Sequence, residues 1–198
     1  MLQILKKSRS LIIVIHEIYG INQHIKDFCN LLSRQDVDVI CPNLIEREQP
    51  FDYDEEEIAY LNFVENVGFS NAIHKIKCLL LDVKNQYQKI YIIGFSVGAT
   101  VAWLCSEEEC LDGIVGFYGS RIRDYTQIEP LCPTILFFPQ EEKSFSVDEL
   151  ISNLNKKNIK IYKYIGQHGF CDPYSTKFNK KSSENAFNQI LNFLKKHS

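Results

Sequence analysis

Residues 94–98 carry a motif whose residue types and spacing suit nucleophilic chemistry. They read Gly-Phe-Ser-Val-Gly, a G-x-S-x-G pattern that directly follows an apolar run and opens a helix-compatible segment. In this strand–turn–helix setting, called a nucleophile elbow, a tight turn pushes the serine hydroxyl outward. The backbone N–H of Val97, at the start of the expected helix, would then face a developing oxyanion. The motif therefore predicts Ser96 as a nucleophile; the alternative is a glycine-rich turn in which Ser96 only caps the helix.

A serine nucleophile needs a general base, and the base needs an acid that orients it. In sheets of this kind the chain order is serine, acid and histidine, each after the end of a strand. Of the five histidines only His168 fits, because it follows the last strand-like run and precedes the final helix-like segment. His16, His24 and His74 precede Ser96, and His197 is at the terminus. We expect His168 to be the base; an incidental surface histidine is the alternative.

The acid is expected in the loop after the apolar run at 134–138. That loop offers two adjacent carboxylates, Glu141 and Glu142. The spacing does not decide between them, and a solvated pair of loop carboxylates is the alternative for both.

The elements that must position these residues alternate along the chain. Strand-like runs of apolar, β-branched and aromatic residues occupy 11–15, 37–41, 90–94, 114–118, 134–138 and 159–165, with one more short edge strand possible at 2–5. Between them lie segments with apolar residues at helical spacing, including 147–156, which Ser146 and Glu149 open as a capping box. This alternation predicts an α/β fold with a mostly parallel sheet and helices on both faces.

One segment, residues 43–68, departs from the alternation. It contains two prolines and an acidic run at 54–57, so we expect a surface excursion with one short helix. The length of 198 residues fits a single domain, residues 1–198.

Composition limits the classes of partner. With a formal net charge of -3 and dispersed Lys and Arg, the sequence indicates no basic surface that would bind nucleic acid or an anionic membrane. The apolar run at 11–15 is too short for a signal peptide or a membrane span. Seven cysteines, most of them in apolar segments and without a C-x-x-C pair, suit a reducing compartment. We therefore expect a cytoplasmic protein; its oligomeric state is not indicated.

Segments along nearly the whole chain, in the correct order, resemble the dienelactone hydrolases of the α/β-hydrolase superfamily. The similar segments are "VIHEIYGINQHIKDFCNLL", "VICPNL", "GFSVGA", "GIVGFYG", "CPTILFFPQEEKSFS" and "GQHGF". The resemblance implies an α/β-hydrolase fold and a catalytic triad of Ser96, an acid and His168. It places the acid at Glu142, with Glu141 as the fallback. It also implies that Glu17 lies beside the nucleophile and that the Ile18 N–H completes the oxyanion hole with Val97.

The chain departs from that family at three positions. The best-known members carry Cys at the nucleophile, where this chain has Ser96, as serine-type relatives do. Their acid is Asp, one methylene shorter than Glu142. An Arg that holds a substrate carboxylate in the family corresponds to Asp172 here, which argues against a dienelactone or similar anionic substrate.

These observations predict a serine esterase that cleaves a small ester or lactone through an acyl-enzyme, without metal or other cofactor. The alternatives are a thioesterase or acyltransferase with the same triad, or a catalytically weak binding protein of the same fold. Tyr19, Tyr118 and Phe170 are expected at the mouth of the site, as substrate-binding or merely core residues. His16, which ends the first long strand, is expected to support a turn by a hydrogen bond.

Overall fold

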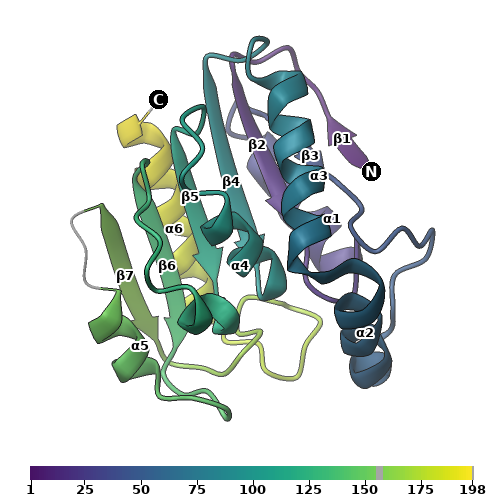
Figure 1. Ribbon diagram of the computed structural model, residues 1–198, viewed down its shortest axis with the longest axis vertical. Coiled ribbons are helices and arrows are strands. Elements are labelled where there is room, and N and C mark those ends of the chain that lie inside the picture. Colours follow the sequence, from purple (N-terminus) through teal and green to yellow (C-terminus); the bar gives the residue numbers. More distant parts are fainter. Residues whose placement is uncertain (155–157, 198) are drawn as a thin grey trace.

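The computed structural model describes residues 1–154 and 158–197. Within these residues, seven strands form one sheet in the order β1-β3-β2-β4-β5-β6-β7 (Figure 1). The strands are β1 (Leu2–Ile4), β2 (Ser10–Ile15), β3 (Asp38–Cys41), β4 (Lys89–Phe95), β5 (Gly113–Phe117), β6 (Thr134–Pro139) and β7 (Ile159–Tyr164). All neighbours are parallel except β1, which pairs antiparallel with β3 at the edge. The expected mostly parallel sheet is confirmed.

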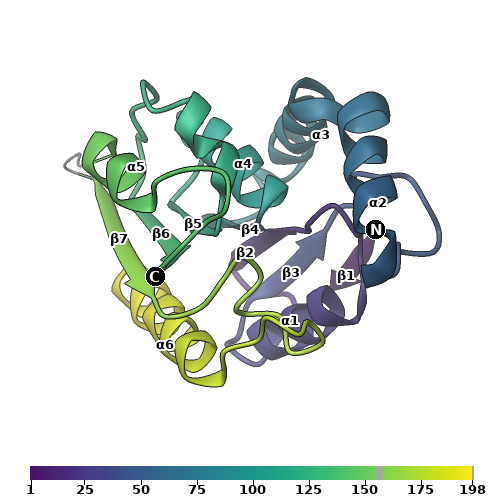
Figure 2. The ribbon, with the colours of Figure 1, turned by 90° about the horizontal axis from the view of Figure 1, so that it is seen from below.

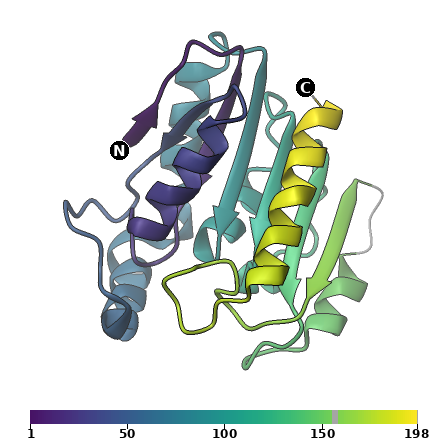
Figure 3. The same ribbon diagram turned by 180° about the vertical axis from the view of Figure 1, so that it is seen from behind.

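Both faces of this sheet are covered by helices, as the two views in Figures 1 and 3 show. The helices are α1 (Gln23–Ser33), α2 (Glu56–Asn62), α3 (Gly68–Val83), α4 (Val97–Leu104), α5 (Val147–Asn153) and α6 (Lys180–His197). Helices α1 and α6 lie on one face, and α3 and α4 lie on the other (Figures 1 and 3). This arrangement confirms the expected layers. The buried apolar side chains form two core clusters, one on each face of the sheet.

Strand β2 is apolar at every position after Ser10, and its burial shows why. Leu11, Ile13 and Ile15 enter the core on the α3–α4 face, whereas Ile12 and Val14 enter the core on the α1–α6 face. All five side chains are fully buried. Successive side chains of a strand point to opposite faces, so a strand covered on both sides is apolar throughout.

The boundaries expected from the sequence agree with the structure to within one or two residues for the strands. The helix expected over 147–156 begins where expected, with the Ser146 hydroxyl accepting a hydrogen bond from the Glu149 N–H at 3.3 Å. It ends at Asn153, and residues 155 and 156 of that prediction lie outside the described residues.

The prediction for residues 43–68 was wrong in one respect, because the segment is not confined to the surface. It contains η1 (Tyr53–Glu55), α2 and a π-helical turn, η2 (Phe63–Val67), before α3 begins at Gly68. Leu44, Phe51 and Phe63 are buried in the core on the α3–α4 face. The acidic run 54–57 fills the first turns of η1 and α2, where carboxylates favour a helix N-terminus rather than a loop.

The carboxyl ends of the parallel strands meet at one edge of the sheet, which Figure 2 views directly. Loops that follow β2, β4, β5, β6 and β7 converge there, as they do in open parallel sheets where ligands bind. None of the described helices combines the length and the apolar character needed to span a bilayer.

Candidate active site

Ser96 lies at the sharp turn between β4 and α4. Its backbone has φ 52° and ψ -113°, in the left-handed half of the φ range that residues other than glycine rarely adopt. Such a conformation costs about 1–3 kcal/mol and is characteristic of functional sites. The Ser96 N–H donates to the Phe117 carbonyl at 2.9 Å, which ties the turn to β5. The strand, the turn and the helix therefore form the elbow that the motif predicts.

The two glycines of the motif allow backbones to approach more closely than any side chain would permit. A Cβ on Gly94 would lie 2.1 Å from the Gly98 carbonyl oxygen. A Cβ on Gly98 would lie 2.4 Å from the carbonyl oxygen of Ile15 and 2.6 Å from that of His16. The absence of these Cβ atoms lets α4 begin directly against the end of β2, next to the turn that carries Glu17 and Ile18.

His168 and Glu142 continue from Ser96 in a chain of hydrogen bonds. The Ser96 Oγ lies 2.9 Å from His168 Nε2, and His168 Nδ1 lies 2.7 Å from Glu142 Oε1. The carboxylate accepts the Nδ1–H, which leaves Nε2 to accept the Ser96 hydroxyl proton. The Glu142 side chain is 8% exposed, whereas Glu141 faces solvent. The structure thus places Glu142, not Glu141, in contact with the imidazole.

Glu17 is a buried carboxyl group close to this chain of hydrogen bonds. Its Oε1 accepts a hydrogen bond from the Tyr118 hydroxyl at 2.8 Å, and the Tyr118 ring centroid lies 4.9 Å from that of His168. Burial raises the pKa of Glu17, although His24, His168 and the Tyr118 hydrogen bond oppose the shift. A carboxyl that resists ionisation adds less negative charge near His168 than an exposed one would.

His16 is held by the backbone on both sides of its ring. The Leu44 N–H donates to His16 Nε2 at 3.0 Å, so the proton is on Nδ1, which donates to the Glu17 carbonyl at 2.6 Å. These bonds agree with the turn-supporting role expected for His16. Burial lowers the pKa of His16 from 6.5 to about 4, because the charged ring would lose its hydration.

This low pKa predicts that acid destabilises the protein through His16. Between pH 6.5 and about 4 the unfolded chain binds the proton and the folded chain does not, so stability falls as pH falls through that range. From pH 7 to pH 5 we expect this residue to cost about 2 kcal/mol of unfolding free energy. Urea denaturation at both pH values would measure the loss, which His16→Asn should reduce by that amount. The exposed His74→Gln should behave as wild type; equal losses in all three proteins would contradict the prediction.

A family model and several relatives place the chain among known proteins. The model of the dienelactone hydrolase family matches residues 3–198. The chain belongs to the dienelactone hydrolase family. The uncharacterized protein YczH of Bacillus subtilis is 39% identical over 175 residues, which cover 87% of this chain and 86% of YczH. A Saccharolobus solfataricus protein with the provisional name carboxymethylenebutenolidase is 24% identical over 229 residues, covering 94% of this chain and 89% of that protein.

Solved structures show the same fold. A dienelactone hydrolase-like promiscuous phosphotriesterase from metagenomic libraries has a TM-score of 0.76 at 13% identity, covering 96% of this chain and 87% of that chain. Est1E from Butyrivibrio proteoclasticus, in a structure with bound ferulic acid, has a TM-score of 0.68 at 12% identity, covering 94% and 90%. These likenesses confirm the α/β-hydrolase fold. As a member of the dienelactone hydrolase family, the protein is an esterase-like hydrolase with a small-molecule substrate.

Asp172 occupies the position that corresponds to the substrate-binding Arg of the dienelactone hydrolase family. In this structure it contacts two tyrosines. Its side chain is 2% exposed and accepts hydrogen bonds from the Tyr53 hydroxyl and, at 2.9 Å, from the Tyr174 N–H. Asp172 therefore joins η1 to the loop that follows His168. Sequence reasoning missed Tyr53, because the contact spans 119 positions and no local pattern marks it.

The three aromatic residues expected at the mouth lie deeper than predicted. Tyr118 and Phe170 are fully buried, with ring centroids 5.5 Å apart, and Tyr118 also packs against His168. Tyr118 therefore packs directly against the histidine and Phe170 packs against Tyr118, which corrects their expected position at the mouth. Tyr19 is 8% exposed and packs against Tyr53 at 5.0 Å between ring centroids.

The opening beside His168 is lined mainly by polar side chains. A pocket of about 500 Å³ there includes Glu56 from α2, Ser120 from the segment after β5, and Gln167. Lys143 and Lys177 add positive charge to its wall. A substrate that reaches His168 through this opening meets both signs of charge.

Proposed function

We propose that the protein is a serine hydrolase that cleaves a small carboxylic ester or lactone through an acyl-enzyme on Ser96. The observation that carries the proposal is the continuous contact from Ser96 Oγ through the His168 ring to the Glu142 carboxylate, at 2.9 Å and 2.7 Å. These distances are within hydrogen-bond reach of a base and its orienting acid. The strained elbow, which holds the hydroxyl at the carboxyl edge of the sheet, supports the same proposal.

In the first step of the proposed reaction, Ser96 Oγ attacks the ester carbonyl carbon while His168 Nε2 takes the hydroxyl proton. Glu142 stabilises the resulting imidazolium through its bond to Nδ1. The tetrahedral intermediate collapses, the C–O bond to the leaving group breaks, and His168 returns the proton to the leaving alkoxide. For an ester the products of this step are the free alcohol and an acyl group on Ser96; for a lactone the new hydroxyl group stays attached to that acyl group.

Water completes the proposed cycle. His168 removes a proton from the attacking water, a second tetrahedral intermediate forms, and the proton returns to Ser96 Oγ as the acyl group leaves as a carboxylic acid. The balance requires only water as co-reactant.

The backbone N–H groups of Val97 and Ile18 are the proposed oxyanion donors. Val97 is the first residue of α4, so its N–H has no partner within the helix. Ile18 lies in a turn in which the Gly20 N–H donates to the Glu17 carbonyl at 3.2 Å, and the missing side chain at Gly98 lets α4 approach the backbone just before this turn. Each such donor contributes about 2.7–4 kcal/mol to transition-state stabilisation in serine hydrolases.

The proposed substrate carries no carboxylate near Asp172, where the corresponding Arg of the family would bind one. Asp172 offers no positive charge, and its oxygens are occupied by Tyr53 and Tyr174. A neutral ester or lactone suits this site better than an anionic one.

We also propose that the chain is a single domain, because each core contains residues from both halves of the sheet.

A fluorophosphonate probe tests the proposed nucleophile directly. Folded protein treated with the probe should gain one adduct, which peptide mass spectrometry should locate on Ser96. The Ser96→Ala and His168→Ala variants should remain unlabelled under the same conditions. Failure to label Ser96 in folded wild-type protein would overturn the proposal and favour a binding protein of this fold.

The choice between two adjacent carboxylates gives a second prediction. Glu142→Ala should lower kcat for a short-chain p-nitrophenyl ester about a thousandfold, because His168 loses the acid that fixes its tautomer. Glu141→Ala, the matched control, should lower kcat far less, since its side chain faces solvent and lines only the opening beside His168. Equal and small losses in the two variants would remove both residues from the proposed mechanism.

A further inference from the structure

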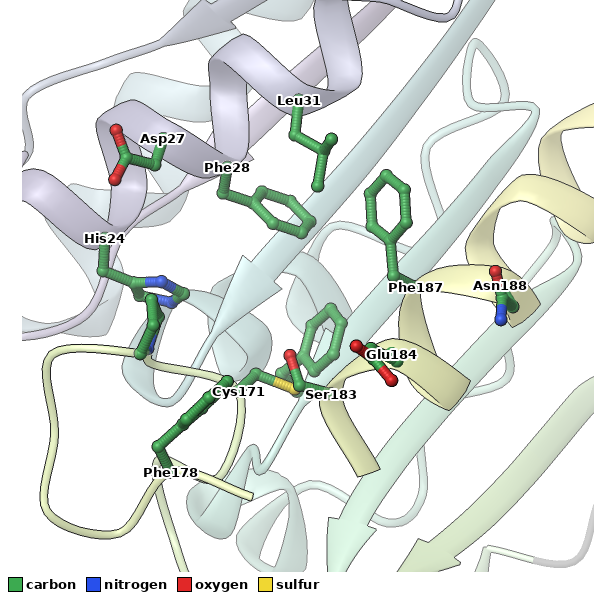
Figure 4. A pocket seen from close by; sticks show the side chains of 12 residues that line it. His24, Asp27, Phe28, Leu31, Cys171, Phe178, Ser183, Glu184, Phe187 and Asn188 are labelled. Atoms are coloured by element: carbon green, nitrogen blue, oxygen red, sulfur yellow. The ribbon is translucent and has the colours of Figure 1, made fainter. Parts of the chain in front are cut away.

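A second pocket lies on the α1–α6 face of the sheet and does not include Ser96, His168 or Glu142. It has a volume of about 480 Å³ and opens between α1 and α6, as the close view in Figure 4 shows. Figure 3 shows these two helices standing apart over the sheet. The size is that of pockets which bind small molecules.

The walls of this pocket are more apolar than polar, and several phenylalanine side chains contribute to them. Phe28 and Leu31 come from α1, Phe187 comes from α6, and Phe117 lies at the end of β5. Phe28 meets Phe187 edge to face at 6.1 Å and Phe117 at 6.2 Å between ring centroids. Leu31 and Phe178 each remain more than a third exposed. A ligand that covers these side chains would gain about 25 cal/mol for each Å² of apolar surface removed from water.

One polar atom in this apolar setting lacks a partner. His24 is 3% exposed, and its Nε2 makes no hydrogen bond with any residue that the structure describes. Figure 4 shows the His24 ring projecting from α1 toward the interior of the pocket. Its other nitrogen, Nδ1, lies 3.9 Å from Asp172 Oδ1. In the neutral ring the carboxylate favours the proton on Nδ1, so Nε2 is an acceptor that needs a donor.

The charges around the pocket select against anions. Asp27 and Glu184 are exposed residues that contribute to its lining, and Asp172 lies behind His24. Among the described residues, no Lys or Arg lines it. An anionic ligand would therefore face like charge without a cation to pair with.

We propose that this pocket binds a small, uncharged aromatic compound that carries a hydroxyl group, such as a phenol. The ring would pack among Phe28, Phe117 and Phe187, and the hydroxyl would donate to His24 Nε2. Aromatic walls favour an aromatic ligand through edge-to-face contacts. The site is separate from the proposed ester hydrolysis and does not depend on it.

Fluorine NMR with three probes tests the proposal in the Ser96→Ala protein, so that the reactive serine plays no part. We expect 4-fluorophenol to bind saturably, and 4-fluoroanisole, which has no donor, to bind at least about tenfold more weakly. The anion 4-fluorobenzoate should bind more weakly than 4-fluorophenol as well. No saturable binding of 4-fluorophenol, or equal affinity for the phenol and the anisole, would overturn the proposal.

Three variants locate the binding. Asn188→Trp places a large side chain at the pocket, whereas Asn185→Trp places one on the exposed part of the same helix outside it. The first should weaken 4-fluorophenol binding at least about tenfold, and the second should leave it unchanged. His24→Phe should abolish the preference for the phenol over the anisole. Unchanged affinity of Asn188→Trp for 4-fluorophenol would place the ligand elsewhere and contradict the assignment. This test holds even if His24→Phe fails to fold. Because the readout is binding, these results stand whether or not the protein hydrolyses esters.

Discussion

Ser96→Ala is expected to lower kcat for hydrolysis of a short-chain p-nitrophenyl ester by at least about a thousandfold. The variant lacks the oxygen that would form the acyl-enzyme, while the oxyanion donors and the binding surface remain. Since Ser96 Oγ makes its hydrogen bond to His168 at the surface of the elbow, the change to alanine should leave the fold intact. Steady-state kinetics, with circular dichroism and thermal unfolding as checks on the fold, would measure the effect.

The control variants make this result specific. Ser70→Ala, at an exposed position of α3, should retain wild-type kcat. His168→Ala should cost about as much as Ser96→Ala, and the double variant should fall no further, because residues that act as a unit are not additive. Independent, multiplying losses in the double variant would show that the two side chains do not act together. Unchanged hydrolysis by Ser96→Ala would remove the serine from the mechanism.

Gly98→Ala should lower the free energy of unfolding strongly. The added Cβ would press on the Ile15 and His16 carbonyl oxygens at 2.4 Å and 2.6 Å, and backbone atoms cannot rotate away. We expect a loss of about 3 kcal/mol or more in unfolding free energy. The fraction that folds should also lose kcat, because α4 and the turn carrying Ile18 must move apart. Urea denaturation and active-site-titrated kinetics would measure the two effects separately.

Gly68→Ala is the matched control for this change. Gly68 has φ +65°, and a Cβ there would meet no atom within 4 Å. With ψ 163°, this backbone lies in a region that essentially only glycine adopts, so the substitution should cost about 1–3 kcal/mol of unfolding free energy with kcat unchanged. The value of kcat therefore separates the two variants: wild-type kcat in folded Gly98→Ala, or an equal loss of kcat in Gly68→Ala, would mean that close approach at Gly98 is not what the site requires.

Much of the architecture could be predicted because its signals are local. The uninterrupted apolar run of β2 identifies a strand buried on both faces, and its residues prove to be divided between the two cores. The G-x-S-x-G motif specifies a strand, a turn and a helix within a few residues, which is what surrounds Ser96. His168 could be selected by chain order alone, since no other histidine follows Ser96 in a loop between a strand and a helix.

Other features could not be predicted because they depend on contacts distant in sequence. The spacing of Glu141 and Glu142 does not decide between them, because the backbone path of an irregular loop determines which side chain turns inward; only the family resemblance pointed to Glu142. Tyr118 has the composition of a mouth residue, yet its hydroxyl donates to Glu17, 101 positions earlier, and the ring is buried. The acidic run at 54–57 is typical of loops and of helix starts alike, and only the burial of neighbouring apolar residues distinguishes them.

The bond between Tyr53 and Asp172 also bears on the order in which the molecule assembles. It joins parts of the chain 119 positions apart, whereas Ser96 and His168 are 72 positions apart. Long-range contacts require more loop closure than local ones and form slowly. The elbow also depends on distant contacts, since the Ser96 N–H donates to the Phe117 carbonyl and Gly98 lies against the end of β2. Because the nucleophile, its base and the loop after the base all need long-range contacts, chemical competence should coincide with completion of the tertiary structure.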